Sequence, residues 1–205
     1  MSKIIIGLTG PTGAGKSTVA AALEEFGCKI IDADQIARNV VMQPECIAEL
    51  TAEYGSDIME AEGRVNRRLL AQRAFSSPQK SSRLNAITHP IIMKEVLRLI
   101  AQEQQNGSAK AIVLDAALLF ESGADQYCTV TVAVTAPVEL RLSRVMNRDF
   151  ISPELAKARV GVQHENDYYK ERADYVFDGT AAVEQIPAEA RILLERILGD
   201  IDEKI

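Results

Sequence analysis

The sequence predicts an α/β protein in which a five-stranded parallel sheet lies between helices in three layers. Short apolar runs alternate with longer stretches of helical periodicity, as expected when parallel strands are buried on both faces. A glycine-rich segment also joins the first run to a stretch typical of a helix. The predicted strands are Ile4–Leu8, Cys28–Ile31, Ala111–Leu114, Thr129–Val134 and Ala173–Phe177.

The glycine-rich segment that follows the first strand reads Gly10-Pro11-Thr12-Gly13-Ala14-Gly15-Lys16-Ser17, the pattern of a P-loop. Glycines let the backbone curl around an anion, so that successive N–H groups and the next helix N-terminus face phosphate oxygens. Lys16 is placed to reach terminal phosphates, and the Ser17 hydroxyl to bind Mg²⁺. The alternative is a glycine-rich turn without a ligand, which the strand and helix on either side disfavour. The predicted nucleotide-binding residues of this segment are Gly13, Ala14, Gly15, Lys16, Ser17 and Thr18.

No strand pattern occurs between the second and third predicted strands, so residues 35–107 are predicted to form an inserted helical lobe. Asn106-Gly107-Ser108 is the turn that returns the chain to the sheet. The helices predicted in this lobe are Gln35–Met42, Pro44–Tyr54, Arg67–Phe75, Pro78–Ile87 and Ile91–Gln105.

A second insertion, residues 137–171, is predicted as a helical hairpin with the form of a lid. Its first helix starts at Pro137, and Ser152 and Pro153 are the cap and first position of its second helix, which contains Arg159 and Gln163. An amphipathic helix over Val183–Leu198 closes the chain. The remaining residues, 1–34, 108–136 and 172–205, are predicted to form the nucleotide-binding core that carries the P-loop.

Asp32 and Asp34 follow the second strand, at the sheet edge where parallel strands present ligand sites. Asp34 is predicted as a general base for a hydroxyl that attacks a γ-phosphate, or as a ligand of Mg²⁺ through water. Asp32 either orients that group or caps the next helix. An equally open alternative is that both aspartates are caps of the helix from Gln35.

Three further residues are candidates for the same site. Asp115 ends an apolar strand, a placement like that of the Walker-B aspartate, which holds Mg²⁺. Glu121 comes after Leu118-Leu119-Phe120 and is placed to face the same site, although such an apolar triple is more often core. His89 precedes Pro90 and a predicted helix, and it is a helix cap, a satisfied residue at the edge of the core, or a contact of an acceptor substrate.

Arginines are concentrated in the predicted hairpin. Arg141, Arg144 and Arg148 are three and four positions apart and so share one helix face, and Arg159 belongs to the next helix. Guanidinium groups stabilise the charge that phosphoryl transfer spreads over oxygens. The alternative is a solvated charged face, and His164 is predicted as a solvated residue of the hairpin.

Composition narrows the class of protein further. The 205-residue chain has a formal net charge of −6, which argues against a broad nucleic-acid-binding face. No apolar run is long enough to span a membrane, and the start has no signal peptide. Three widely spaced cysteines without a Cys-x-x-Cys pair predict reduced thiols and a cytoplasmic location. No nucleic acid, membrane or obligate protein partner is expected.

From Ile4 to about Ala181 the chain resembles the dephospho-CoA kinase family. The P-loop is shared by many families, but Asp32-Ala33-Asp34-Gln35-Ile36-Ala37-Arg38 and Ala173-Asp174-Tyr175-Val176 are far more diagnostic. The other segments that carry the resemblance are Gly7–Gly10, Gly13–Ala20, Leu84-Asn85, His89–Ile92, Leu118–Glu121, Arg148-Asp149 and Arg159 with Gln163.

The resemblance implies that ATP phosphorylates the ribose 3′-hydroxyl of dephospho-CoA, giving CoA and ADP in the last step of CoA synthesis. It implies a P-loop NTPase core, a helical CoA-binding lobe and a lid. Asp34 would be the base, Lys16 and Arg148 would stabilise the transferring phosphoryl group, and Arg144 would bind nucleotide. The acceptor residues implied in this way are Asp32, Asp34, His89, Leu118, Glu121, Arg159 and Gln163, and the implied Mg²⁺ residues are Ser17, Asp34 and Asp115.

Three positions depart from the pattern of that family. Pro11 removes one N–H donor from the loop, Ala117 stands where a proline usually precedes the Leu-Leu pair, and Gly179 stands where asparagine is common. Two other functions stay open: a P-loop kinase for a nucleoside monophosphate or a sugar, for which Arg67, Arg68 and Arg83 leave room, and a nucleotide-dependent binding module. A guanine-specific switch is disfavoured because no Asn-Lys-x-Asp segment is present.

Overall fold

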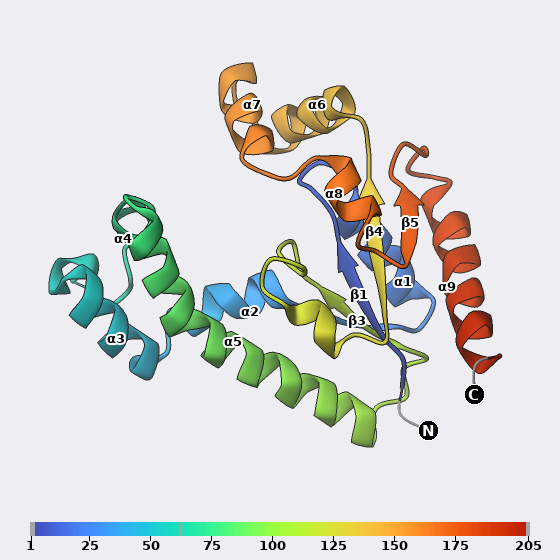
Figure 1. The fold of residues 1–205 in the computed structure, drawn as a ribbon, viewed down its shortest axis with the longest axis horizontal. Helices are drawn as coiled ribbons and strands as arrows, with labels where there is room; N and C mark the ends of the chain where they lie inside the picture. Colours follow the sequence, from blue (N-terminus) through green and yellow to red (C-terminus); the bar gives the residue numbers. More distant parts are fainter. Residues whose placement is uncertain (1–2, 62, 204–205) are drawn as a thin grey trace. The chain divides into compact units, whose positions relative to one another are not determined.

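The computed structural model describes residues 3–61 and 63–203, and the chain divides into two compact units (Figure 1). The first unit comprises residues 1–31 and 102–205, and the second comprises residues 32–101. Each unit is described by itself.

A five-stranded sheet with the order β2-β3-β1-β4-β5 forms the centre of the α/β fold (Figure 1). Parallel pairing sets Leu8 of β1 opposite Asp115 of β3 on one side and opposite Val132 of β4 on the other. The predicted fold class is confirmed, and every predicted strand is present with its ends displaced by one or two residues. The strands are β1 Ile5–Thr9, β2 Lys29–Asp32, β3 Ile112–Asp115, β4 Val130–Thr135 and β5 Tyr175–Asp178.

Burial differs between the central and the outer strands. Every residue of β3 and β4 is buried, as expected for strands covered on both faces. The expectation that all strands are fully buried is wrong for β2 and β5, which lie at the two edges of the sheet. In β5 Phe177 is buried whereas Val176 is exposed, because successive side chains of a strand point to opposite faces of the sheet.

Two helices of the first unit build its main core. Helix α1, Lys16–Glu25, packs with α9, Ile186–Asp202, which corresponds to the predicted closing helix but starts and ends later (Figure 1). Side chains of both helices join those of β1 and β4 in one apolar cluster. Members of this cluster are Leu8, Val19, Leu23, Val132, Val134, Leu194 and Ile197.

The insertion after β4 is a helical hairpin. Helix α6 spans Val138–Asp149 and helix α7 spans Pro153–Gly161, and Val145, Ala156 and Val160 are buried where they pack together. Ser152 caps α7 as predicted, accepting a hydrogen bond from the backbone N–H of Leu155 at 3.4 Å. The prediction that Gln163 lies in this helix is wrong, because α7 ends at Gly161. The short helices α8, Asn166–Lys170, and η2, Ala124–Tyr127, complete the unit.

The second unit contains short helices and most of one long one. Helix α3, Pro44–Tyr54, has the predicted bounds, while α2 (Ala33–Val40) and α4 (Arg67–Ala74) each end earlier than predicted. A single 3₁₀ turn, η1 Ser56–Ile58, follows α3.

One helix, α5, runs continuously over Pro78–Asn106, past the end of the second unit and into the first. The prediction of two helices separated at His89-Pro90 is therefore wrong. Proline removes one helical N–H donor and crowds the carbonyl four residues earlier, which bends a helix without always ending it. Here Ile87, just before Pro90, and Val96 beyond it are both buried, so packing on both sides favours continuing the helix.

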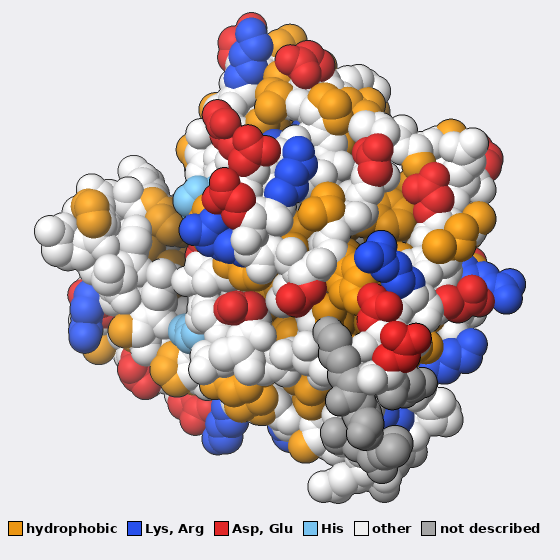
Figure 2. All heavy atoms as spheres, turned by 45° about the vertical axis from the view of Figure 1, so that its right-hand side comes forward, with side chains coloured by type: hydrophobic (Ala, Val, Ile, Leu, Met, Phe, Trp, Pro, Cys, Tyr) orange, Lys and Arg blue, Asp and Glu red, His pale blue; other side chains and the backbone are white. Residues whose placement is uncertain are grey.

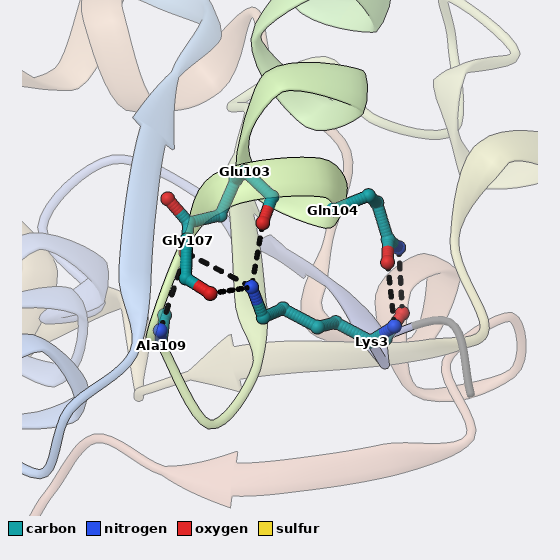
Figure 3. A network of polar contacts seen from close by, with 5 residues as sticks. All are labelled: Lys3, Glu103, Gln104, Gly107 and Ala109. Atoms are coloured by element: carbon teal, nitrogen blue, oxygen red, sulfur yellow. Dashed lines mark hydrogen bonds and ion pairs between the residues drawn. The ribbon is translucent and has the colours of Figure 1, made fainter.

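The end of α5 is tied to the residue before β1 (Figure 3). The ammonium group of Lys3 donates to the carbonyl oxygens of Glu103 and Gly107 at 2.5 and 2.6 Å. Lys3 also exchanges two backbone hydrogen bonds with the side-chain amide of Gln104. A cation on the last carbonyls of a helix satisfies groups that have no intrahelical partner, and so fixes where β1 begins.

Candidate active site

The P-loop connects the end of β1, at Thr9, to the start of α1, at Lys16. Gly13 and Gly15 have φ values of 80° and 107°, in the left-handed region that favours glycine. A Cβ atom on Gly13 would lie 2.6 Å from the backbone oxygen of Arg141, so the loop passes α6 too closely for a side chain. At these two positions the loop therefore depends on glycine, the residue that lets a backbone curl around an anion.

Lys16 and Asp115 form an ion pair at the end of the loop. Strands β1 and β3 are neighbours, and Asp115 is the last residue of β3, so the sheet itself brings this carboxylate to the first turn of α1. Both side chains are largely buried, with 15% and 10% of their surfaces exposed. Screening by water is weak at such a place, which strengthens the attraction.

Ser17 and Thr18 lie in the first turn of α1, whose cap Gly15 supplies no side chain. The first N–H groups of a helix have no intrahelical acceptor and carry partial positive charge. Such a helix end binds phosphate readily.

Two arginines of α6 hold carbonyl groups of the loop. Arg141 is 1% exposed, and its Nε donates to the carbonyl oxygen of Thr12 at 3.0 Å. Arg144 donates to the carbonyl oxygens of Gly13 and Ala14, both at 3.3 Å. Burial lowers the pKa of Arg141 from its ordinary value, which still leaves the guanidinium charged at neutral pH. The predicted arginine face of this helix is thus directed in part at the loop backbone.

Arg148 and Arg159 meet at one carboxylate. Asp149 accepts two hydrogen bonds from Arg148, at 2.7 and 3.0 Å, and one from Arg159 of α7 at 2.6 Å. The hydrogen bonds from Arg148 and the charge of both guanidinium groups hold the pKa of Asp149 below its ordinary value. Both arginines remain more than half exposed, so each keeps donors toward solvent.

Gln163 contacts the loop from the segment after α7. Its side-chain oxygen accepts a hydrogen bond from the backbone N–H of Thr12 at 2.8 Å. No local pattern signals this contact, because the two residues are 151 positions apart.

Glu121 lies beside an aromatic stack that no local sequence pattern predicts. The ring of His164 stacks on that of Tyr168 with centroids 3.7 Å apart, and the guanidinium of Arg172 lies 3.9 Å from the Tyr168 centroid. His164 Nε2 is 3.7 Å from a carboxylate oxygen of Glu121, and its side chain is 51% exposed. Leu118 is 58% exposed, unlike the buried Leu119 that follows it.

In the second unit the aspartate that ends β2 and the one two residues later have different surroundings. Asp32 is the N-cap of α2 and accepts a hydrogen bond from the Gln35 N–H at 2.7 Å. Asp34 lies inside the first turn of the same helix, so the alternative in which both aspartates are caps is wrong.

His89 lies within α5, not before a helix, and so does not cap one. Its buried Nε2 has no hydrogen-bond partner among the residues that the structure describes. A buried nitrogen without a partner is costly unless a ligand or water supplies one.

The described residues contain no group of three or more His, Cys, Asp or Glu side chains that could hold a metal ion. Among the same residues, no helix is both long and apolar enough to cross a membrane. Cys28, Cys46 and Cys128 are free thiols.

A parallel sheet that brings a glycine-rich loop, a lysine and a strand-end aspartate together defines the class of P-loop phosphotransferases. Comparison with known proteins narrows the class. The sequence model of the family described as dephospho-CoA kinase matches residues 4–185. The chain belongs to the dephospho-CoA kinase family.

Individual relatives agree with the family model. The dephospho-CoA kinase of Corynebacterium diphtheriae is 39% identical over 200 residues, which cover 97% of this chain and 99% of that protein. The crystal structure of TT1252 from Thermus thermophilus superposes with a TM-score of 0.82 at 32% identity, covering 98% of each chain. The dephospho-CoA kinase of Campylobacter jejuni shares the fold, with a TM-score of 0.62 at 24% identity and coverage of 94% of this chain and 96% of that one.

Membership of this family assigns the reaction class. The chain is an ATP-dependent transferase that phosphorylates a hydroxyl group of dephospho-CoA, the final step of CoA synthesis.

Proposed function

We propose that the P-loop of the first unit holds the phosphates of ATP, and that Lys16 and Asp115 are its central charged groups. The observation that carries this proposal is the buried ion pair between them at the ends of β3 and the loop. Lys16 is held at the start of α1 and exchanges Asp115 for a phosphate oxygen when nucleotide binds. Gly13, Ala14 and Gly15 supply backbone around the phosphates, and Ser17 and Thr18 supply the helix N-terminus.

The residues present fit Mg²⁺. This ion is usually bound through one or two protein oxygens, with phosphates and water as its other ligands, so a dense carboxylate cluster is not required. Asp115 and Ser17 are the donors of this kind in the first unit, and Asp34 is the candidate in the second. When bound, the ion neutralises charge on the phosphate oxygens.

Arginines of the hairpin would stabilise the transferring group. Arg148 has the exposed guanidinium and the flexible side chain needed to move from Asp149 to a phosphate, and Arg144 lies beside the loop. In this proposal residues 137–171 act as the lid that excludes water, and the nucleotide-binding core is residues 1–34, 108–136 and 172–205.

Residues 35–107 are the proposed acceptor lobe for dephospho-CoA. Asp34, which is not used as a helix cap, takes the proton of the ribose 3′-hydroxyl as that oxygen attacks the γ-phosphorus. His89 offers an unpartnered buried nitrogen to the acceptor. The remaining acceptor contacts that the family resemblance implies are Asp32, Leu118, Glu121, Arg159 and Gln163. The three free thiols support a reducing, cytoplasmic location.

An ADP-release assay with ATP and Mg²⁺ tests the proposal. Wild-type protein should turn over only with dephospho-CoA, and not with AMP, adenosine or gluconate as acceptor. Lys16→Ala should lose most turnover and most ATP affinity while the circular-dichroism spectrum and melting temperature are retained. Unchanged ATP affinity in a folded Lys16→Ala protein would place the nucleotide elsewhere.

A further inference from the structure

Thr12, which precedes Gly13 in the P-loop, is held through both of its backbone polar groups. Its carbonyl oxygen accepts from Arg141 of α6 at 3.0 Å, and its N–H donates to Gln163 at 2.8 Å. Arg141 stands near the start of the α6–α7 hairpin, and Gln163 stands just past its end. Both ends of the hairpin therefore converge on one residue of the P-loop.

The direction of the loop's N–H groups follows from these contacts. In a planar trans peptide the carbonyl of one residue and the N–H of the next point in opposite directions. Because Arg141 and Arg144 hold the carbonyls of Thr12 and Ala14, the N–H groups of Gly13 and Gly15 are turned away from α6. Those are the directions an anion inside the loop requires.

Gln163 completes this arrangement on the other side of Thr12. Arginine has no hydrogen-bond acceptor, so the N–H of Thr12 needs an oxygen from another residue. Pro11 has no N–H, and its carbonyl already accepts from Ala14 at 3.1 Å, so Thr12 is the only residue between Gly10 and Gly13 with an N–H to donate. The amide oxygen of Gln163 fixes that N–H without adding charge beside the phosphates.

We propose that Gln163 is a positioning residue for ATP, which holds the P-loop in its binding form through the Thr12 N–H and couples loop order to the hairpin. This inference rests on the proposed nucleotide site, and it gives Gln163 a different role from the acceptor contact that the family resemblance implies. Arg141 is the second half of the same clamp, buried and fixed on the Thr12 carbonyl.

Two substitutions of matched length test the proposal in the full-length protein. Gln163→Met keeps the side-chain length and removes the oxygen, whereas Gln163→Glu keeps an oxygen at the same distance from the backbone. Val162→Met places the same new side chain one residue earlier, at a position that is 84% exposed, and serves as the control.

Amide hydrogen exchange of Thr12 in nucleotide-free protein is the direct measurement. Gln163→Met should speed it by about three- to tenfold, the range of one ordinary hydrogen bond, and Gln163→Glu should restore it to the wild-type rate. The dissociation constant for ATP should rise by a similar factor in Gln163→Met, while the KM for dephospho-CoA changes less than twofold. Val162→Met should match wild type in all three measurements.

Several results would overturn the role of Gln163. These are an unchanged Thr12 exchange rate in Gln163→Met, an equally fast rate in Gln163→Glu, or a raised KM for dephospho-CoA with unaltered ATP affinity. Failure of the nucleotide site itself would look different: Lys16→Ala would bind ATP as wild type does, while the exchange measurement, made without nucleotide, would still report on the clamp.

Discussion

At the scale of single residues, Asp32 and Asp34 show how two neighbouring carboxylates divide structural and chemical roles. One carboxylate oxygen of Asp32 accepts a hydrogen bond from the N–H of Gln35, whereas Asp34 does not cap the helix. Asp34→Asn should therefore lower kcat by about 10²–10⁴-fold, the usual contribution of a positioned base, with little change in melting temperature. Steady-state kinetics with dephospho-CoA and thermal unfolding of the same samples measure both quantities.

Asp32 provides the matched comparison. Asp32→Ala removes the helix cap and should lower the free energy of unfolding by about 1 kcal/mol, whereas Asp32→Asn keeps a capping oxygen and should not. For Asp34, near-wild-type turnover in a folded Asp34→Asn protein would refute the role of this carboxylate as the base.

Gly179 lies too close to the backbone of the P-loop to carry a side chain. A Cβ atom there would lie 2.0 Å from the carbonyl oxygen of Ala14 in the P-loop, and the Gly179 N–H donates to Thr135 at 2.8 Å. Gly179→Ala should push the loop aside, lowering the free energy of unfolding by about 1–3 kcal/mol and weakening ATP binding. Urea unfolding and a nucleotide titration measure the two effects.

The control for Gly179 is a glycine with open space around it. Gly199 lies on the exposed side of α9 with no atom within 4 Å of an added Cβ. Gly199→Ala should stabilise the protein by about 0.5–1 kcal/mol, because alanine loses less backbone entropy in a helix. Equal effects of the two substitutions would mean that the approach to Ala14 carries no cost.

At the scale of elements, the sequence pattern correctly predicted those features that depend on neighbouring residues alone. The β1–loop–α1 unit, the strand end at Asp115 and the capped start of α7 at Ser152 are all confirmed, because each depends on residues adjacent in sequence. The hydrogen-bond partners of Arg141 and Gln163 could not be predicted from the sequence. They are backbone groups 129 and 151 residues away, and only the packing of α6 and α7 against the sheet unit selects them.

The helix α5 was mispredicted for a related reason. A proline inside a helical pattern is a strong local stop signal, yet burial on both sides of Pro90 outweighs one lost hydrogen bond. The edge strands β2 and β5 carry apolar runs like those of central strands, so sequence alone could not rank their burial.

Pro90→Ala should raise the stability of α5. The substitution restores an N–H donor and removes the clash with the carbonyl four residues earlier, which is worth at most about 3 kcal/mol. The melting temperature should rise, and the KM for dephospho-CoA should also increase, since Pro90 adjoins the proposed acceptor contact His89. Calorimetry and kinetics on one preparation separate the two effects, and a lower melting temperature would show that the surrounding packing requires the proline.

At the scale of the whole molecule, the chain carries more acidic than basic side chains. Figure 2 shows acidic and basic side chains interspersed with apolar ones on the face in view, in keeping with the net charge of −6. An acidic protein must therefore attract a polyphosphate locally. Lys16, Arg141 and Arg144 supply that local charge by lying against the same loop.

The three thiols, of which Cys28 and Cys46 are buried and Cys128 is partly buried, make the stability of the whole molecule fall at alkaline pH. Burial raises the pKa of Cys28 and Cys46 to about 11, and that of Cys128 to about 12, from an ordinary value near 9. Above pH 9 the unfolded chain loses thiol protons that the folded chain keeps, so the unfolded state binds fewer protons and stability falls as pH rises. The loss is at most about 1.4 kcal/mol per pH unit for each thiol.

Cys128→Ala tests this linkage. Cys128 packs beneath β1, where a Cβ atom on Gly7 would lie 2.7 Å from its sulfur, so the substitution also leaves a small cavity that lowers stability at every pH. The effect of the substitution that tests the linkage is on the pH dependence of the free energy of unfolding. Between pH 9 and 11 this free energy should fall less steeply in Cys128→Ala than in wild type. Urea unfolding at pH 8, 9, 10 and 11 measures it. Parallel curves for the two proteins would mean that the Cys128 thiol ionises as readily in the folded chain as in the unfolded one.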